Sequence, residues 1–172
     1  MKIKITNTQL KDLPDIYEMF DAAIEYQKSK NFPVWPDYDK QLLEDDIKDK
    51  KQFKISRDNT LACIFTICDD DAIVWRERTK IPALYLHRVV THPDHKGHRL
   101  FETVLRWTIS LCRAKNITRI RMDTWAENIT LIEYYKTFGF YFVEYFQNPD
   151  DETMPIQQRG NKVILLEYKI PH

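Results

Sequence analysis

The spacing of hydrophobic residues predicts both strands and helices along this chain. Apolar and polar residues alternate over Lys2–Thr6 and again over Ile117–Trp125, as they do in strands that bury one face. Over Gln9–Lys28 and Gly97–Ala114, apolar residues recur every three or four positions, which is typical of helices with one buried side. The pattern therefore predicts a fold of the mixed α/β (α+β) class.

The remaining segments complete the predicted order βααβββαβαββ. They are a helix over Asp39–Lys50, a hairpin of Phe53–Ser56 and Leu61–Cys68 turned at Asp58-Asn59, a strand over Ile81–Thr91, a helix capped by Asn128 and stopped at Gly139, and closing strands over Phe140–Phe146 and Val163–Ile170. The charged segment from Asp69 to Lys80 and the polar segment Asn148–Asn161 are predicted as connections. No repeat or linker divides the 172 residues, so we expect a single domain over positions 1–172.

Composition narrows the class of protein. Twenty-six basic residues balance 26 acidic ones, which argues against nucleic-acid binding. There is no apolar run long enough for a transmembrane helix, and Met1–Thr6 is typical of a strand rather than of a signal peptide. Cys63, Cys68 and Cys112 are odd in number and lack CxxC spacing, which favours buried, reduced thiols. We therefore expect a cytoplasmic protein that does not bind membranes.

The segment Leu84–Phe101 carries the first chemical signal. It begins as an apolar, β-branched run, breaks at Pro93 and Gly97, and resumes with helical spacing. The first N–H groups of a helix have no partners within the helix, so a strand, a loop and a helix start in this order make a site for an anion. Lys96 and Arg99 lie beside it. These residues predict a phosphate-binding loop.

The element order and two local motifs resemble the GNAT superfamily of N-acetyltransferases. The first motif is Val89–Phe101, which is similar to the family's strand, pyrophosphate loop and helix. The second is Asn128–Phe140, which resembles the signature Asn-x-x-Ala-x-x-x-Tyr-x-x-x-Gly-Phe, with Leu131 in place of alanine. The resemblance implies a mixed, mostly antiparallel sheet of six to seven strands, with splayed central strands and flanking helices. It also implies acetyl-CoA as the acyl donor and no metal.

The pyrophosphate loop departs from the family pattern Arg/Gln-x-x-Gly-x-Gly/Ala. Lys96 stands at the Arg/Gln position, Gly97 remains, and Arg99 and Phe101 replace the two glycines. In one alternative the backbone N–H groups of Gly97–Phe101 still hold pyrophosphate, with Phe101 facing the core. In the other, Arg99 and Phe101 obstruct the site, and the protein is a catalytically weak or inactive acyl-CoA-binding sensor. A second rival is an unrelated α/β interaction domain.

The resemblance assigns further residues to coenzyme A. Asn128 corresponds to a residue that contacts the coenzyme, and Tyr135 to the tyrosine near the thioester sulfur. A phenol with a pKa of about 10 stays protonated at neutral pH and can donate a proton to the leaving thiolate. The alternative is that Tyr135 is a core tyrosine beside Ile132 and Phe138. The complete set of predicted coenzyme-binding residues is Val89, Val90, Thr91, Lys96, Gly97, His98, Arg99, Leu100, Phe101 and Asn128.

The strand Tyr85–Thr91 is expected to hold the reacting groups. In the family this strand separates from the next, here Ile120–Thr124, and backbone donors near Val89 and Val90 polarise the thioester carbonyl. Alternation places Tyr85, His87 and Val89 on one face and Arg88 and Val90 on the other. His87 is the candidate general base that takes a proton from the attacking amine, directly or through water. The alternatives are that His87 is an ordinary strand residue and that the enzyme has no dedicated base.

Aromatic residues between the first two helices suggest an acceptor site. Trp35 and Tyr38, flanked by Asp37 and Asp39, are expected to be exposed and to receive a cationic amine together with Tyr85. The alternative is that Trp35 packs against the core. The resemblance thus implies acetyl transfer to a primary amine of a small molecule or peptide by direct attack in a ternary complex, and it allows a homodimer through a closing strand.

Two histidine and aspartate patterns invite a metal assignment, and neither supports one. His92, His95 and His98 recur every three residues, but Pro93 and Gly97 make a regular helix there unfavourable, and no carboxylate or cysteine pattern completes a ligand set. Asp69–Asp71 is typical of a turn at the end of a strand. The sequence therefore predicts no metal site.

Overall fold

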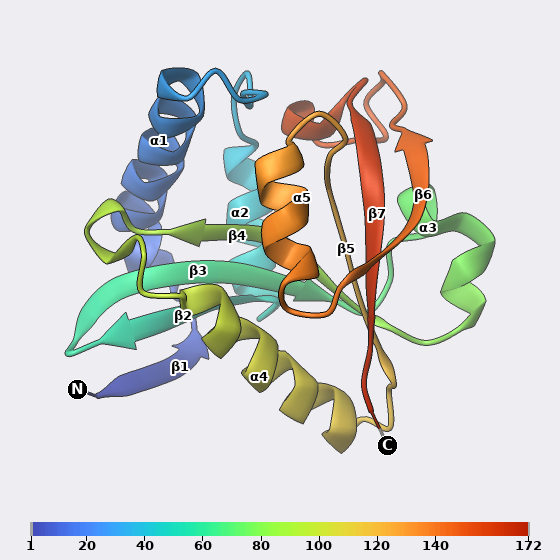
Figure 1. The fold of residues 1–172 in the computed structure, drawn as a ribbon. Helices are drawn as coiled ribbons and strands as arrows, with labels where there is room; N and C mark the ends of the chain where they lie inside the picture. Colours follow the sequence, from blue (N-terminus) through green and yellow to red (C-terminus); the bar gives the residue numbers. More distant parts are fainter. Residues whose placement is uncertain (1, 172) are drawn as a thin grey trace. The chain divides into compact units, whose positions relative to one another are not determined.

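Strands and helices alternate along residues 2–171, which a computed structural model describes (Figure 1). The strands are β1 (Ile3–Asn7), β2 (Gln52–Arg57), β3 (Thr60–Cys68), β4 (Leu84–Thr91), β5 (Arg119–Trp125), β6 (Tyr141–Gln147) and β7 (Lys162–Lys169). The α-helices are α1 (Leu13–Ser29), α2 (Lys40–Lys48), α3 (Ala72–Trp75), α4 (Leu100–Ala114) and α5 (Ile129–Lys136). This order confirms the predicted one and adds α3.

The strands form one hydrogen-bonded series in the order β1-β2-β3-β4-β5-β7-β6. The pairs β1·β2, β2·β3, β5·β7 and β6·β7 are antiparallel, and β4·β5 is parallel. The sheet is thus mixed and mostly antiparallel, as predicted. The chain divides into two compact units, and β4 contributes Leu84–His87 to one and Arg88–Thr91 to the other.

The first unit contains the chain up to Ile67, Arg88–Phe101 and a short segment of the later loop. Its hairpin turns at Asp58-Asn59, where both residues have positive φ, as a two-residue hairpin turn requires. Helices α1 and α2 share one apolar core with the strands. Its buried residues are Ile16, Met19, Phe20, Tyr38, Leu43, Ile47, Ile64 and Val90. Asp39 caps α2 by accepting from the N–H of Leu42 at 3.0 Å.

The second unit contains Cys68–His87, Glu102–Met154 and the chain from Gln158. Strand β7 separates two layers of side chains in it. Val163 and Leu165 pack with Trp75 of α3, with Tyr85 and with Met154 of the later loop. The ring of Tyr168 contacts Phe140, which lies just after α5. Because residues on a strand alternate in direction, α3 and the end of the α5 segment cover opposite faces of β7.

Two predicted boundaries were wrong, and both have a backbone reason. The connection Asp69–Lys80 contains α3 and a 3-10 turn over Arg76–Lys80, anchored by a fully buried Trp75. Helix α4 begins at Leu100 instead of Gly97, because Gly97 (φ +82°) and Arg99 (φ +51°) have left-handed backbones that a right-handed helix cannot include.

The three cysteines differ in burial, and Cys68 is less buried than predicted. All three cysteines are free thiols, with Cys63 and Cys112 buried and Cys68 half-buried. Among the described residues, none of the helices has the length and apolar character needed to cross a membrane.

Candidate active site

Strand β4 contains one residue with an unusual backbone, Arg88, which has a left-handed φ of +48°. Such a residue within a strand produces a local bulge, because it re-aims the peptide groups that follow. The side chain of Arg88 donates to the carboxylate of Asp46 on α2, and both side chains are buried. The alternation used to place Val89 on the face of Tyr85 and His87 therefore does not extend past Arg88. Val90 is buried, and Val89 and Thr91 are half-buried.

The loop that follows β4 leads directly into the N-terminus of α4. Its 3-10 turn is capped by His92, whose Nδ1 accepts from the N–H of Asp94 at 3.2 Å. Leu100 and Phe101 are 4% and 5% exposed, so Phe101 does face the core, as predicted. Gly97, His98 and Arg99 are exposed. The polar start of α4 is thus bordered by a surface loop with its apolar residues turned inward.

The backbone of this loop is open to its surroundings at Gly97 and left-handed at Arg99. A Cβ built on Gly97 meets no atom within 4 Å, so its backbone borders open space. Arg99, which stands where the family pattern has glycine, has the left-handed backbone that glycine adopts most easily. The loop therefore keeps a glycine-like path at this position in spite of the substitution.

Lys96 lies against an aromatic ring in the first unit. Its Nζ is 3.3 Å from the centroid of the Tyr26 ring on α1. Lys30 Nζ lies 5.9 Å from the same centroid. Desolvation and the nearby charge of Lys30 lower the pKa of Lys96. The structure thus brings two cations to one tyrosine, and no motif in the sequence indicates a role for Tyr26.

Helix α5 positions the two residues predicted from the second motif. The Oδ1 atom of Asn128 accepts from the N–H of Leu131 at 3.0 Å, so Asn128 caps the helix as predicted. Tyr135 is 8% exposed, and its ring lies 6.3 Å from that of Phe140. The adjacent Tyr134 is 38% exposed, which agrees with its predicted rotation away from Tyr135.

His87 lies in a group of side chains that the sequence did not connect. Its Nε2 is 3.5 Å from Oδ2 of Asp71, which follows β3. Ligand atoms of Asp71, His87 and Asp123 of β5 all lie within 4.8 Å of one another, and all three residues are half-buried. Asp123 was missed because its proximity to His87 depends on how β4 and β5 pair, and Asp71 was missed because its position depends on the path of the chain between β3 and α3. The nearby sequence signal was Asp69–Asp71, interpreted only as a turn.

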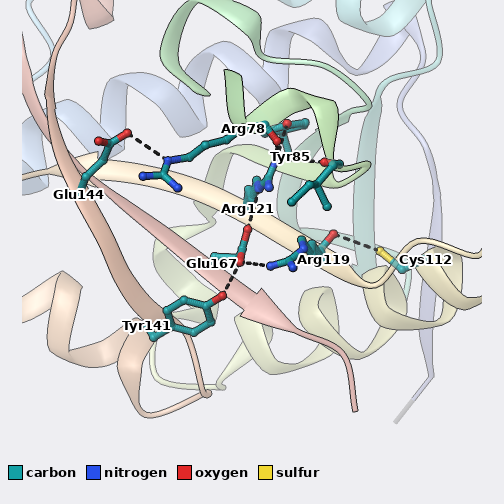
Figure 2. Close-up of polar contacts among 9 residues, drawn as sticks. Arg78, Tyr85, Cys112, Arg119, Arg121, Tyr141, Glu144 and Glu167 are labelled. Atoms are coloured by element: carbon teal, nitrogen blue, oxygen red, sulfur yellow. Dashed lines mark hydrogen bonds and ion pairs between the residues drawn. The ribbon is translucent and has the colours of Figure 1, made fainter. Parts of the chain in front are cut away.

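Tyr85 belongs to a buried network around Arg121, drawn in Figure 2. Arg121 is 2% exposed and donates through Nη1 to the Tyr85 hydroxyl at 2.9 Å and to the backbone carbonyls of Arg78 and Ile81 at 2.8 and 3.2 Å. Its guanidinium also lies over the Trp75 ring. Tyr85 is itself only 1% exposed. The Tyr85 hydroxyl therefore lies in the protein interior, hydrogen-bonded to Arg121, and does not line a surface-exposed acceptor site.

Glu167 of β7 completes this network. Arg121 Nε donates to its Oε2 at 2.8 Å, and Arg119 and Tyr141 both donate to its Oε1 (Figure 2). Burial alone would raise the pKa of Glu167, but the hydrogen bonds from Tyr141 and Arg121 and the charges of both arginines hold it below its ordinary value. Glu167 is therefore a buried carboxylate that is fully partnered by donors.

Of the two aromatic residues predicted to be exposed, Trp35 and Tyr38, the prediction was wrong for Tyr38. Tyr38 is 7% exposed, its ring lies 5.0 Å from Phe20, and its hydroxyl donates to Asp21 at 3.0 Å. Trp35 is half-buried and stacks on Phe20, so the packed alternative describes it better. Both residues join the helices of the first unit because large aromatic rings gain most by burial there.

Comparison with known families agrees with this geometry. The sequence model described as "Acetyltransferase (GNAT) family" matches residues 16–140, which is more than half of the chain. The chain belongs to the GNAT acetyltransferase family. It is therefore an acyltransferase, and acetyl-CoA is the acyl donor that its family uses.

Solved GNAT structures share the fold at low sequence identity. A GNAT acetyltransferase from Listeria monocytogenes has a TM-score of 0.78 and 19% identity, over 98% of this chain and 95% of that chain. The putative acetyltransferase yncA from Salmonella typhimurium, solved with its cofactor acetyl-CoA, has a TM-score of 0.68 and 13% identity, over 100% and 96%. Arabidopsis thaliana Naa50, in complex with the bisubstrate analogue CoA-Ac-MVNAL, has a TM-score of 0.66 and 14% identity, over 97% and 98%. No curated protein matches the sequence significantly.

Proposed function

We propose that this GNAT protein transfers an acetyl group from acetyl-CoA to a primary amine of a small molecule or peptide, by direct attack in a ternary complex. The observation that carries the proposal is the left-handed backbone of Arg99. It supports the alternative in which the loop still binds pyrophosphate, because the family's glycines serve to give the backbone this path and close approach. A loop obstructed by Arg99 and Phe101 would instead favour the catalytically weak or inactive acyl-CoA-binding sensor.

The proposed roles on the donor side follow from residue type and backbone. N–H groups of Gly97–Phe101 at the start of α4 bind pyrophosphate, assisted by Lys96. Backbone donors of Val89 and Val90, which follow the left-handed Arg88, orient the thioester carbonyl and stabilise its developing negative charge. Tyr135 donates its phenolic proton to the leaving thiolate.

In the proposed reaction, the amine nitrogen attacks the thioester carbonyl carbon, a C–N bond forms and the C–S bond breaks. His87 accepts one proton from the ammonium before attack and later releases it to solvent. Tyr135 supplies the proton that makes the free thiol, and the second proton that leaves the nitrogen as the amide forms restores the Tyr135 phenol. One acetyl group moves, and one proton is released in total.

The proposed acceptor amines include the kinds for which solved GNAT neighbours are named. One is a ribosomal-protein-S18-alanine N-acetyltransferase from Escherichia coli, and Arabidopsis Naa50 was solved with a peptide-containing analogue. For this chain we therefore keep both peptide and small-molecule amines. Because basic residues do not outnumber acidic ones, we do not include nucleic acids among the proposed partners.

The test measures thiol release from acetyl-CoA with a panel of n-butylamine, a diamine, free lysine and peptides with free N-termini. Mass spectrometry must then find one added acetyl group on the amine. We expect at least one acceptor to be turned over. Binding of acetyl-CoA by calorimetry, with no acetylated product from any amine, would instead identify an acyl-CoA sensor. Absence of both binding and turnover would identify an interaction domain.

A further inference from the structure

Three polar side chains from three segments of the second unit converge around one point. They are Asp71 after β3, His87 on β4 and Asp123 on β5, and their ligand atoms all lie within 4.8 Å of one another. The side chains of Asp71 and His87 are 14% and 12% exposed, so they are reached by solvent from a limited direction. The group presents two carboxylates and one imidazole.

The pairing of β4 with β5 explains two members of this group. Tyr85 is the register partner of Arg121 in the parallel ladder, so His87 and Asp123 stand two residues further along both strands. Residues two apart on a strand share a face. The cluster is therefore the next layer on the side of the sheet that carries the Tyr85–Arg121 hydrogen bond.

The segment from α3 to Ile81 brings Asp71 to the same place. Trp75 is fully buried, and its ring lies 6.0 Å from that of Tyr85 in an edge-to-face contact. Arg121 holds the carbonyls of Arg78 and Ile81 (Figure 2). Asp71 is also the residue whose carbonyl accepts from the N–H of Trp75 at 2.9 Å. The buried network of Arg121, Tyr85 and Trp75 thus also fixes the position of Asp71.

The charges of this layer differ from those of the layer below. Arg119 and Arg121 both pair with Glu167, and Arg76 and Arg78 both pair with Glu144, so each of these carboxylates faces two guanidinium groups. The cluster instead brings together two carboxylates and one imidazole. Carboxylate oxygens and an unprotonated imidazole nitrogen accept hydrogen bonds, and such a set suits a cationic ligand that carries several N–H donors.

We propose that Asp71, His87 and Asp123 bind the ammonium group of the acceptor amine. This inference rests on the proposed function, because it assigns the acceptor's reacting nitrogen to a place within the second unit. A primary amine reaches the enzyme protonated at neutral pH, with three N–H donors. Three acceptors bound to one ammonium at about 2.8 Å and tetrahedral angles lie about 4.6 Å apart. The ligand atoms of the cluster lie within 4.8 Å of one another, and His87 Nε2 and Asp71 Oδ2, which are 3.5 Å apart, must separate by about 1 Å when the ammonium binds between them.

The cluster then performs two steps in order. Asp71 and Asp123 hold the ammonium by charge-assisted hydrogen bonds, and neutral His87 accepts one of its protons at a ring nitrogen. The amine that results has a free electron pair for attack, and the imidazolium stays between two carboxylates until it returns the proton to solvent. Asp71 and Asp123 are binding residues, and His87 is the proton acceptor.

The first experiment separates amine binding from donor binding. Initial rates are measured with the best amine of the panel for Asp71→Asn, Asp123→Asn and the matched control Asp69→Asn, an exposed acid in the same loop. We expect the KM for the amine to rise about tenfold in each cluster variant, with the KM for acetyl-CoA unchanged within twofold. Asp69→Asn should match wild type. If the cluster variants behave like Asp69→Asn, the proposal is overturned.

The second experiment does not depend on turnover. Imidazole nitrogen signals of ¹⁵N-histidine protein are recorded in the presence of CoA, and His87 is assigned with His87→Gln. Addition of n-butylamine should shift the His87 signals, whereas n-butanol should not, and Asp71→Asn/Asp123→Asn should abolish the shift. Equal effects of amine and alcohol would overturn the proposal, as would loss of activity on chelation with recovery on adding Mn²⁺ or Zn²⁺. A specific shift without any acetyl transfer would support this site and refute the proposed function.

Discussion

The ammonium of Lys96 rests on the ring of Tyr26, with Nζ 3.3 Å from the ring centroid. This contact orients the one basic residue that stands at the Arg/Gln position of the family's pyrophosphate loop. Lys30 lies on the same ring at 5.9 Å and, together with desolvation, lowers the pKa of Lys96. An anion that binds here relieves the repulsion between the two lysines. The pair is therefore suited to a phosphate group rather than to a neutral ligand.

Replacing Lys96 with Met should weaken the binding of CoA. Loss of one charge-assisted contact to phosphate predicts a rise in Kd of about tenfold, measured by calorimetry at low salt. Lys28→Met is the matched control, because Lys28 is an exposed lysine of α1 that pairs with Glu25. Its Kd should stay within twofold of wild type. An equal loss in both variants would mean that only overall charge matters.

CoA binding should also be linked to protonation of Lys96. Its lowered pKa should rise towards the ordinary value when a phosphate group binds, so binding takes up protons at pH values near that pKa. Affinity for CoA should then fall as the pH rises through the alkaline range. Calorimetry in buffers of different ionisation enthalpy measures the proton uptake. Lys96→Met should remove it.

Substitution of Arg99 by glycine should change CoA binding little, whereas substitution of Gly97 by valine should weaken it strongly. Arg99→Gly relieves a left-handed backbone but gains unfolded-state entropy, so the free energy of unfolding should change by less than about 1 kcal/mol. The Kd for CoA should change less than threefold, because the backbone supplies the donors. Gly97→Val forces a β-branched residue to φ +82° and should weaken CoA binding strongly. A large loss of affinity in Arg99→Gly would assign phosphate binding to the Arg99 side chain.

Most elements were predictable because their signals are local. Asp39 and Asn128 cap helices through their own side chains as expected, whereas α5 ends at Lys136, three residues before Gly139 (φ +97°), where the helix was predicted to stop. Helix α3 was missed because four residues are too few for a helical period, and the burial of Trp75 depends on Tyr85 and on β7.

The site was predictable only where one segment carries it. The loop into α4 and the Tyr135 helix are continuous motifs, so the sequence indicates them directly. His87 and Asp123 meet through the pairing of two parallel strands, and Asp71 joins them from the segment between β3 and α3, neither of which hydrophobic alternation specifies. Tyr38 was predicted to be exposed because prolines and aspartates surround it in the sequence. Its hydroxyl donates a hydrogen bond to Asp21 of α1, and this partner allows the side chain to be buried.

Tyr135→Phe should lower kcat without changing the KM for acetyl-CoA. Loss of a general acid predicts a fall of roughly 100-fold, because the thiolate must then leave unprotonated. The adjacent Tyr134→Phe is the control, since Tyr134 is 38% exposed, whereas Tyr135 is 8% exposed. It should retain the wild-type rate. Full turnover with an unchanged pH profile in Tyr135→Phe would remove Tyr135 from the proposed mechanism.

The buried thiols should not interfere with these assays. Burial raises the pKa of Cys63 to about 12 and that of Cys112 to about 11, so both stay protonated at neutral pH. In the native protein an aromatic disulfide reagent should react faster with the half-buried Cys68 than with either of them. Peptide mapping after a short exposure measures this order. In guanidinium all three should react at similar rates.

Glu167 should make the second unit sensitive to acid. Its lowered pKa means that its stabilising effect is present above the ordinary value of 4.5 and is lost as the pH falls through its folded-state pKa. Urea unfolding of wild type should therefore show stability falling from about pH 5 to about pH 3. Glu167→Gln should flatten that fall, whereas Glu127→Gln, an exposed acid, should leave it unchanged. Glu167→Ala should cost about 3–5 kcal/mol at neutral pH, because it leaves Arg121 buried without its carboxylate. A loss near zero would show that solvent replaces the ion pair, and that Arg121 fixes the Arg78–Ile81 segment without it.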